Sequence, residues 1–144
     1  MEARTKSSPV VTGKLTIHGA KDVFSQIDLE FKGLKINSRV NHPETIDSYD
    51  LNGSSGTFLT IFSKINKDLS LLALSEDTVV RYCRNHRDVL ELEGQKTFFY
   101  LGDNVVAKVT YYSDGLHINR YKLDSDIIWM VEGGRQRLFV VPGE

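Results

Sequence analysis

The last third of the chain, from Lys96 to Val141, most constrains what this sequence can fold into. Runs rich in β-branched and aromatic residues alternate there with short breaks that carry Gly, Asp or Asn. Such breaks tolerate the positive φ angles that tight hairpin turns need. Asp114-Gly115, between two of these runs, is a strong short-range hairpin signal. The expected strands are 98–101, 105–112, 116–123, 127–131 and 137–141.

The rest of the chain predicts further strands and one helix. Strands are expected at 10–17, on both sides of a Lys32-Gly33 turn within 25–40, at 58–65, at 69–74 and at 89–93. Ser75 is a good N-cap, and the acidic residues after it suit the positive end of a helix dipole, so a short helix is predicted over 76–86. About 9–11 short strands with frequent turns are typical of an antiparallel β-sandwich or barrel. The predicted fold class is therefore mostly β, with one short helix.

Length and composition indicate one globular domain. The chain has 144 residues, of which 40% are hydrophobic and 26% charged, which is ordinary for a domain with a sizeable core. Residues 1–8 are polar and predict a flexible tail, and 9–144 predict a single β-rich domain. The net charge of -1 disfavours nucleic acid as a partner. A single cysteine, Cys83, and the lack of an apolar leader or spanning run predict a cytoplasmic protein that does not enter a membrane.

Signals for catalysis or metal binding are weak. The four histidines, His18, His42, His86 and His117, lack the clustered spacing of zinc ligands. Cys83 and His86 are three residues apart on the predicted helix, where a thiolate–imidazolium pair would be nucleophilic, but free cysteine more often behaves as a buried apolar residue. We therefore expect no catalytic residues, metal or cofactor. A small β-barrel enzyme that uses histidine and carboxylates is the less favoured alternative.

The hairpin over 105–123 carries the first group of candidate binding residues. Tyrosine, histidine and arginine provide contact area with a polar tip, although aromatic residues are also simply good strand formers. With Asp114-Gly115 as the turn, one face of the hairpin should carry 109, 111, 118 and 120, and the other 106, 108, 112, 117 and 121. The candidates are Tyr111, Tyr112, His117, Arg120 and Tyr121.

Two further groups lie outside that hairpin. The segment 41–56 is expected to be a long loop, and loops of this length are often functional. Its candidates are Asp47, Tyr49, Asp50 and Asn52. A basic patch of Arg81, Arg84 and Arg87 lies on the predicted helix and just after its end. Asp77 and Asp88 are spaced i, i+4 with Arg81 and Arg84, so they could pair with them.

Taken together, these features favour a non-catalytic binding module. We expect it to use a sheet face or edge for contact with a protein partner or for self-association as a homo-oligomer. The alternative is a carbohydrate or small-ligand binder of lectin-like design, with the hairpin tyrosines as its platform and 41–56 as a lid.

Overall fold

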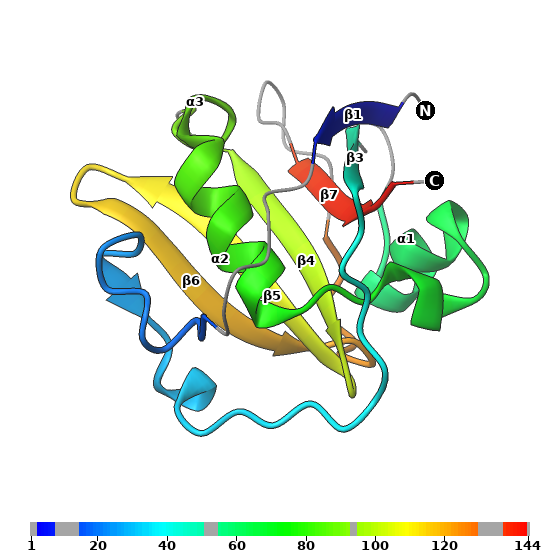
Figure 1. Cartoon of the computed structure of the whole chain (residues 1–144). Helices are drawn as coiled ribbons and strands as arrows, with labels where there is room; N and C mark the ends of the chain where they lie inside the picture. The colour runs from blue at the N-terminus through cyan, green and yellow to red at the C-terminus, as the bar shows by residue number, and fades with distance from the viewer. Residues whose placement is uncertain (1–2, 8–14, 51–54, 93–94, 130–136, 144) are drawn as a thin grey trace.

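The computed structural model describes residues 3–7, 15–50, 55–92, 95–129 and 137–143. Within them sheet dominates, and the strands form one mixed, seven-stranded sheet in the order β1-β3-β7-β4-β5-β6-β2 (Figure 1). The strands are β1 (Ala3–Ser7), β2 (Gln26–Ile27), β3 (Thr45–Asp50), β4 (Lys96–Gly102), β5 (Val105–Tyr112), β6 (Gly115–Lys122) and β7 (Arg137–Pro142).

The sheet confirms the mostly-β prediction and corrects its details. β4, β5 and β6 form an antiparallel meander, as their turn residues predicted. However, β7 runs parallel to β4, and β2 runs parallel to β6, so the sheet is mixed rather than antiparallel. The two edge strands, β1 and β2, do not pair with each other, so the sheet is not closed. Neither a sandwich nor a barrel is established.

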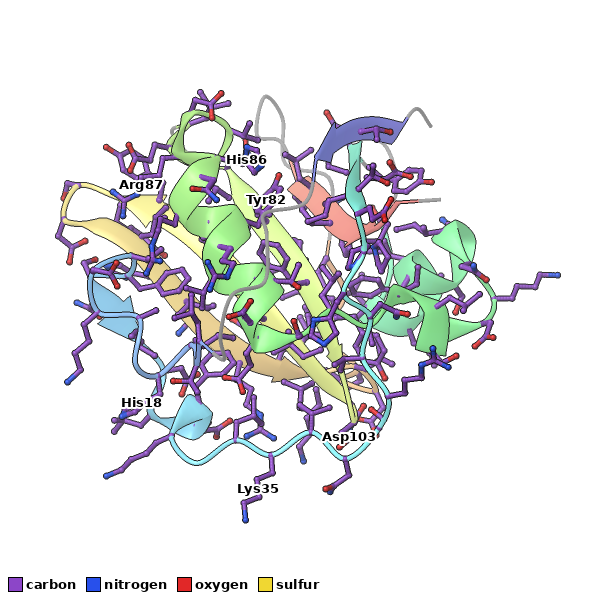
Figure 2. The ribbon with its side chains drawn as sticks, viewed as in Figure 1. His18, Lys35, Tyr82, His86, Arg87 and Asp103 are labelled. Atoms are coloured by element: carbon purple, nitrogen blue, oxygen red, sulfur yellow. The ribbon has the colours of Figure 1, made fainter. Side chains whose placement is uncertain are left out.

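The β4–β5 turn anchors a distant segment of the chain. Gly102, Asp103 and Asn104 all have positive φ, at 87°, 49° and 65°. The two carboxylate oxygens of Asp103 (labelled in Figure 2) accept hydrogen bonds from the backbone N–H groups of Asn37 and Ser38. These hydrogen bonds lower the pKa of Asp103. The turn therefore holds the long connection that leads into β3.

The β5–β6 hairpin has the predicted faces but a different turn. Tyr112 lies opposite Gly115, so Ser113 and Asp114 form the turn and Gly115 begins β6. The register differs by two residues from the one that an Asp114-Gly115 turn implies. Because side chains alternate with a period of two, a shift of two leaves every residue on its predicted face.

One face of the sheet is covered by the predicted helix. α2 (Glu76–Asn85) lies in front of β4, β5 and β6 in Figure 1, and Ser75 caps it by accepting a hydrogen bond from the N–H of Thr78. The short helix α3 (Arg87–Leu90) follows it. Apolar side chains of α2 are buried in a cluster with residues of the sheet and of the segment 15–36.

The other face is covered by elements that were predicted as strands. Residues 58–65 form the helix α1 (Phe58–Ile65), and 69–74 contain the 3-10 helix η2 (Leu69–Leu72). Thr57 caps α1 by accepting a hydrogen bond from the N–H of Thr60. The apolar residues of α1 have the spacing i, i+3, i+4 and i+7, which one face of a helix requires. They are Phe58, Ile61 and Phe62, which are buried in the second core cluster, and Ile65, which is partly buried and packs against it.

Three further strand predictions also differ from the structure. In 25–40, Asp28 caps the 3-10 helix η1 (Leu29–Phe31), so Lys32-Gly33 is a turn but not the turn of a hairpin. In 89–93, Val89 and Leu90 end α3, and 93 lies outside the described residues. Of 127–131, Trp129 forms only an isolated bridge with Gly56, and 130–131 are not described.

Two other predictions concern the N-terminal half. Most of the strand predicted at 10–17, together with part of the tail at 1–8, lies outside the described residues, although Ala3–Ser7 forms β1. The loop predicted over 41–56 contains the strand β3, because Thr45–Asp50 pairs with both β1 and β7. Within the described residues, no helix has the length and apolar character needed to cross a membrane.

Candidate functional site

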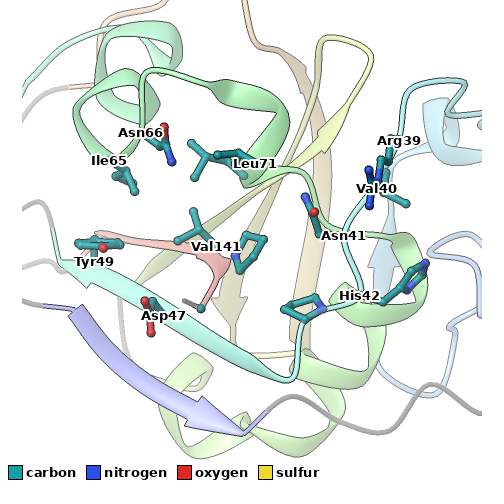
Figure 3. A pocket seen from close by; sticks show the side chains of 14 residues that line it. Arg39, Val40, Asn41, His42, Asp47, Tyr49, Ile65, Asn66, Leu71 and Val141 are labelled. Carbon is teal, nitrogen blue, oxygen red and sulfur yellow. The ribbon is translucent and has the colours of Figure 1, made fainter.

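A groove of about 700 Å³ opens on the sheet face that carries α1 (Figure 3). It lies over β3 and β7 and is bordered by the end of α1, by η2 and by residues 39–43. Its volume is within the range of roughly 300–1,000 Å³ that is usual for ligand sites. We name it the β3–β7 groove.

Apolar side chains from four elements line the β3–β7 groove. Val141 of β7 is buried, Tyr49 of β3 and Ile65 of α1 are half-buried, and Leu71 of η2 is 52% exposed. A ligand that covers the exposed half of Leu71 is stabilised on the groove, since burial of apolar surface contributes about 25 cal/mol per Å². The groove therefore offers an apolar surface to a ligand.

Two amide side chains add hydrogen-bonding groups of opposite kinds. Asn41 donates from Nδ2 to the carbonyl oxygens of Ser70 and Ala73, at 3.1 and 2.8 Å, which leaves its Oδ1 as an acceptor. Asn66 accepts from the N–H of Asp68 through its Oδ1 at 2.9 Å, which leaves its Nδ2 as a donor. Asn41 Oδ1 and Asn66 Nδ2 have no partner among the described residues. The groove can thus both accept from and donate to a ligand.

Charged side chains of both signs complete the lining. Asp47 of β3 is buried, and its Oδ1 accepts a hydrogen bond of 2.6 Å from the hydroxyl of Thr5 on β1. Arg39 and His42 are exposed at the side of the groove opposite Tyr49 (Figure 3). The Nδ1 of His42 lies 3.3 Å from the hydroxyl of Ser75, the residue that caps α2. Because both signs are present, the lining does not select strongly for the net charge of a ligand.

Two of the four candidates predicted from the 41–56 segment line this groove. Asp47 and Tyr49 line it, from a strand rather than from a loop. Asp50 ends the same strand and is not among the lining residues. Asn52 lies outside the described residues.

The hairpin candidates are divided between the two sheet faces. Tyr111 packs against the core cluster beneath α2, and Arg120, on the same face, donates from its guanidinium to the carbonyl oxygen of Glu30. On the other face Tyr112 is 47% exposed, and its ring centroid lies 4.3 Å from that of His117. Tyr121 packs edge-on against Phe58 of α1. These residues therefore do not form one platform.

The basic patch of Arg81 and Arg84 on α2 and Arg87 on α3 is largely neutralised. Arg81 pairs with Asp77 at 2.9 Å, as its spacing predicted. Arg84 pairs with Asp22 at 2.8 Å, and Arg87 pairs with Glu91 at 3.2 Å. Cations that already have carboxylate partners contribute little to the binding of phosphate groups.

The Cys83–His86 pair lacks the features of a nucleophile. Cys83 is a residue of α2 whose side chain is fully buried in the core, and this burial raises the pKa of its thiol. A reactive cysteine needs the opposite shift, because the thiolate is the attacking form. His86 packs its ring on Tyr82 at 4.7 Å, near Arg87 at the end of α2 (Figure 2). No group of three or more potential metal ligands is found in the described ranges.

Sequence reasoning missed several residues of the groove. Asn41, Asn66 and Leu71 lie in separate connections, and only the sheet and α1 bring these connections together. The available signal was helical spacing in 58–65, which would have placed Ile65 and Asn66 at the end of a helix. Comparison of the chain with family models, curated proteins and solved structures finds no match.

Proposed function

We propose that this chain is a non-catalytic binding module that recognises an extended segment of a protein partner in the β3–β7 groove. The observation that carries the proposal is the groove itself, with a half-exposed leucine beside a donor and an acceptor amide. A peptide backbone offers N–H and C=O groups in alternation, so it can bond with both Asn41 Oδ1 and Asn66 Nδ2. Its side chains can cover the apolar lining.

A sheet face is a better binding surface here than the side of β6 that the two-residue strand β2 leaves largely uncovered. Along β6, the carbonyl oxygens of Leu116 and Ile118 accept hydrogen bonds from the N–H groups of Ser25 and Asp28, both at 2.9 Å. The carboxylate of Asp28 accepts from the N–H of Arg120 at 3.0 Å. Because these edge groups already have partners, a further strand has little to pair with there.

A carbohydrate is the second candidate ligand. The half-buried ring of Tyr49 lies in the same groove as Asp47 and the two amides, and such a mixture of aromatic and hydrogen-bonding groups also suits sugar hydroxyls. A glycan array separates the two ligand classes. Binding to one family of glycans that is lost in Tyr49→Ala favours the sugar, and an array without hits favours the peptide.

The experiment that tests the proposal is selection of peptide ligands from a phage-displayed random library on the folded chain. Selected peptides are then tested against two variants that each remove one exposed leucine. Leu71→Ser alters the groove, whereas Leu59→Ser changes a residue of α1 that is 44% exposed and does not line it. Each variant replaces a leucine of similar exposure with serine, so the two variants differ in the position of the change.

A further inference from the structure

The charged residues that line the β3–β7 groove are separated by sign. Asp47 lies on the β3 side of the groove, whereas Arg39 and His42 lie on the opposite side (Figure 3). The same view shows the apolar side chains of Leu71 and Val141 between them. An extended ligand that crosses the groove therefore meets a negative charge at one end and positive charge at the other.

The carboxylate of Asp47 can accept more hydrogen bonds than it has. Its Oδ1 accepts from the hydroxyl of Thr5 at 2.6 Å, and its Oδ2 has no partner among the described residues. Asp47 is 9% exposed, so a ligand in the groove removes much of the water that still reaches this charge. An apolar ligand group would leave the carboxylate uncompensated, whereas a lysine or arginine side chain would form a charge-assisted hydrogen bond with it. This end of the groove therefore favours a cation.

The ring of Tyr49 adds to this preference. Tyr49 lies two residues after Asp47 on β3, so both side chains are on the same face of the sheet, and both line the groove. A cation that pairs with the carboxylate thus lies near an aromatic ring, which attracts it further.

The positive end of the groove is more exposed and should contribute less to affinity. Arg39 is exposed and forms no ion pair or hydrogen bond within the part of the chain that the structure describes. Glu44 is also exposed, but it does not line the groove. Exposed ion pairs contribute little to affinity and act mainly on the rate of association. An acidic ligand group near Arg39 should therefore mainly accelerate binding.

The length of the connection between the two ends limits the spacing of the ligand charges. His42 and Asp47 are five residues apart, so their Cα atoms are separated by at most about 18 Å. An extended peptide rises about 3.3 Å per residue and points every second side chain to the same face. Two charged residues at i and i+4 therefore span about 13 Å. The residue at i+2 then faces the apolar lining around Leu71.

We propose that the ligand of the β3–β7 groove is an extended peptide with a basic and an acidic side chain four residues apart and an apolar side chain midway between them. The basic side chain pairs with Asp47, the apolar one covers Leu71, and the acidic one lies near Arg39. The proposal rests on the proposed function and adds selectivity for the placement of charges rather than for net charge. The direction of the peptide in the groove determines which charge comes first in its sequence.

The test is calorimetric titration of the peptides selected on the folded chain, which should share this pattern. Asp47→Asn keeps an acceptor for the hydroxyl of Thr5 and removes the charge, so the affinity of these peptides should fall about tenfold or more. Glu44→Gln is the matched control, because it removes one negative charge at an exposed position outside the lining. It should bind the peptides as wild type does. Thermal unfolding verifies that both variants are folded.

A change in the peptide tests the same contact without affecting the fold of the chain. Replacement of the basic peptide residue by methionine should reduce the affinity for wild type as much as Asp47→Asn does. The two changes together should cause little further loss, because they remove one interaction.

Reversal of the charge at Arg39 tests the other end. Arg39→Glu should bind the selected peptides more slowly than wild type does. A peptide whose acidic residue is replaced by lysine should bind Arg39→Glu about two- to fivefold more tightly than it binds wild type. An unchanged preference in Arg39→Glu would overturn the acidic half of the pattern.

The outcomes distinguish this proposal from the proposed function. Peptides that lose affinity for Leu71→Ser but bind Asp47→Asn as tightly as wild type overturn the charge pattern and leave peptide recognition in the groove intact. Peptides that bind the groove without a basic residue have the same meaning. A selection that yields no peptide sensitive to Leu71→Ser overturns both.

Discussion

Asp77 of α2 accepts a hydrogen bond of 2.8 Å from the backbone N–H of Leu15, which lies 62 residues earlier in the chain. The neighbouring Glu76 accepts a second one, of 3.1 Å, from the N–H of Ile17. The first turn of α2 thus holds the segment that enters the core beneath the helix. Both carboxylates also lie at the positive end of the helix dipole, where negative charge is favoured.

Removal of the Asp77 carboxylate should loosen this attachment. Asp77→Ala leaves the N–H of Leu15 without this acceptor and ends the ion pair with Arg81, whose atoms are 2.9 Å apart. We expect the free energy of unfolding to fall by about 2–4 kcal/mol, because the pair is mostly buried. Urea unfolding measures the change, and Asp88→Ala, at an exposed position on α3, is the control. Equal effects of the two substitutions would contradict the attachment.

Glu76 should make stability depend on pH in the acid range. Burial raises the pKa of Glu76 above its ordinary value of 4.5. Between the two values the folded state binds more protons than the unfolded state, so stability falls as pH rises through this window. Glu76→Gln keeps an acceptor for the N–H of Ile17 and removes the charge. The urea midpoint of Glu76→Gln should therefore not fall as pH rises through this window. Parallel pH profiles for wild type and variant would refute a raised pKa of Glu76 as the cause.

Asp103 should show the opposite dependence. Its hydrogen bonds lower the pKa from the ordinary 3.8, so its contribution to stability is present above that value and is lost as pH falls through the folded-state pKa. Asp103→Asn still tolerates positive φ but offers one acceptor oxygen in place of two. Carboxyl NMR titration should give a depressed pKa in wild type, and amide exchange at Ser38 or Asn37 should be faster in the variant. An ordinary pKa together with unchanged exchange would rule out the anchor.

Two residues of α1 that are two positions apart should differ sharply in their effect on stability. Ile61 is fully buried, whereas Leu59 is 44% exposed. Ile61→Ala should cost about 2–5 kcal/mol, and Leu59→Ala less than about 0.5 kcal/mol. A strand over 58–65 would place 59 and 61 on the same face, so similar losses would contradict the helix. Chemical denaturation distinguishes the two cases.

The parts of the fold that depend on local chemistry could be predicted from the sequence. The β4, β5 and β6 strands are separated by residues that accept positive φ, and Ser75 marks the start of α2. The face on which each hairpin residue lies was also predictable, because Tyr111 and Tyr112 must point in opposite directions whichever turn joins the strands. The turn itself was misplaced by one residue.

Other elements could not be identified from local pattern alone. In the run 58–65 helical spacing was present, but the high apolar content also suits a buried strand, so the spacing was not decisive without the tertiary packing. Thr45–Asp50 resembles a loop in composition, yet it pairs with both β1 and β7. The β3–β7 groove was predictable only through Asp47 and Tyr49, because the remaining lining comes from connections that meet through the sheet and α1.

The most direct test of the proposed function is the affinity of selected peptides for the two leucine variants. We expect peptides that bind wild type to lose at least about tenfold in affinity for Leu71→Ser, because its apolar contact in the groove is gone, and to bind Leu59→Ser as they bind wild type. Thermal unfolding verifies that both variants are folded. A selection that yields no binding peptide, or peptides that bind Leu71→Ser as tightly as wild type, would contradict recognition in the β3–β7 groove.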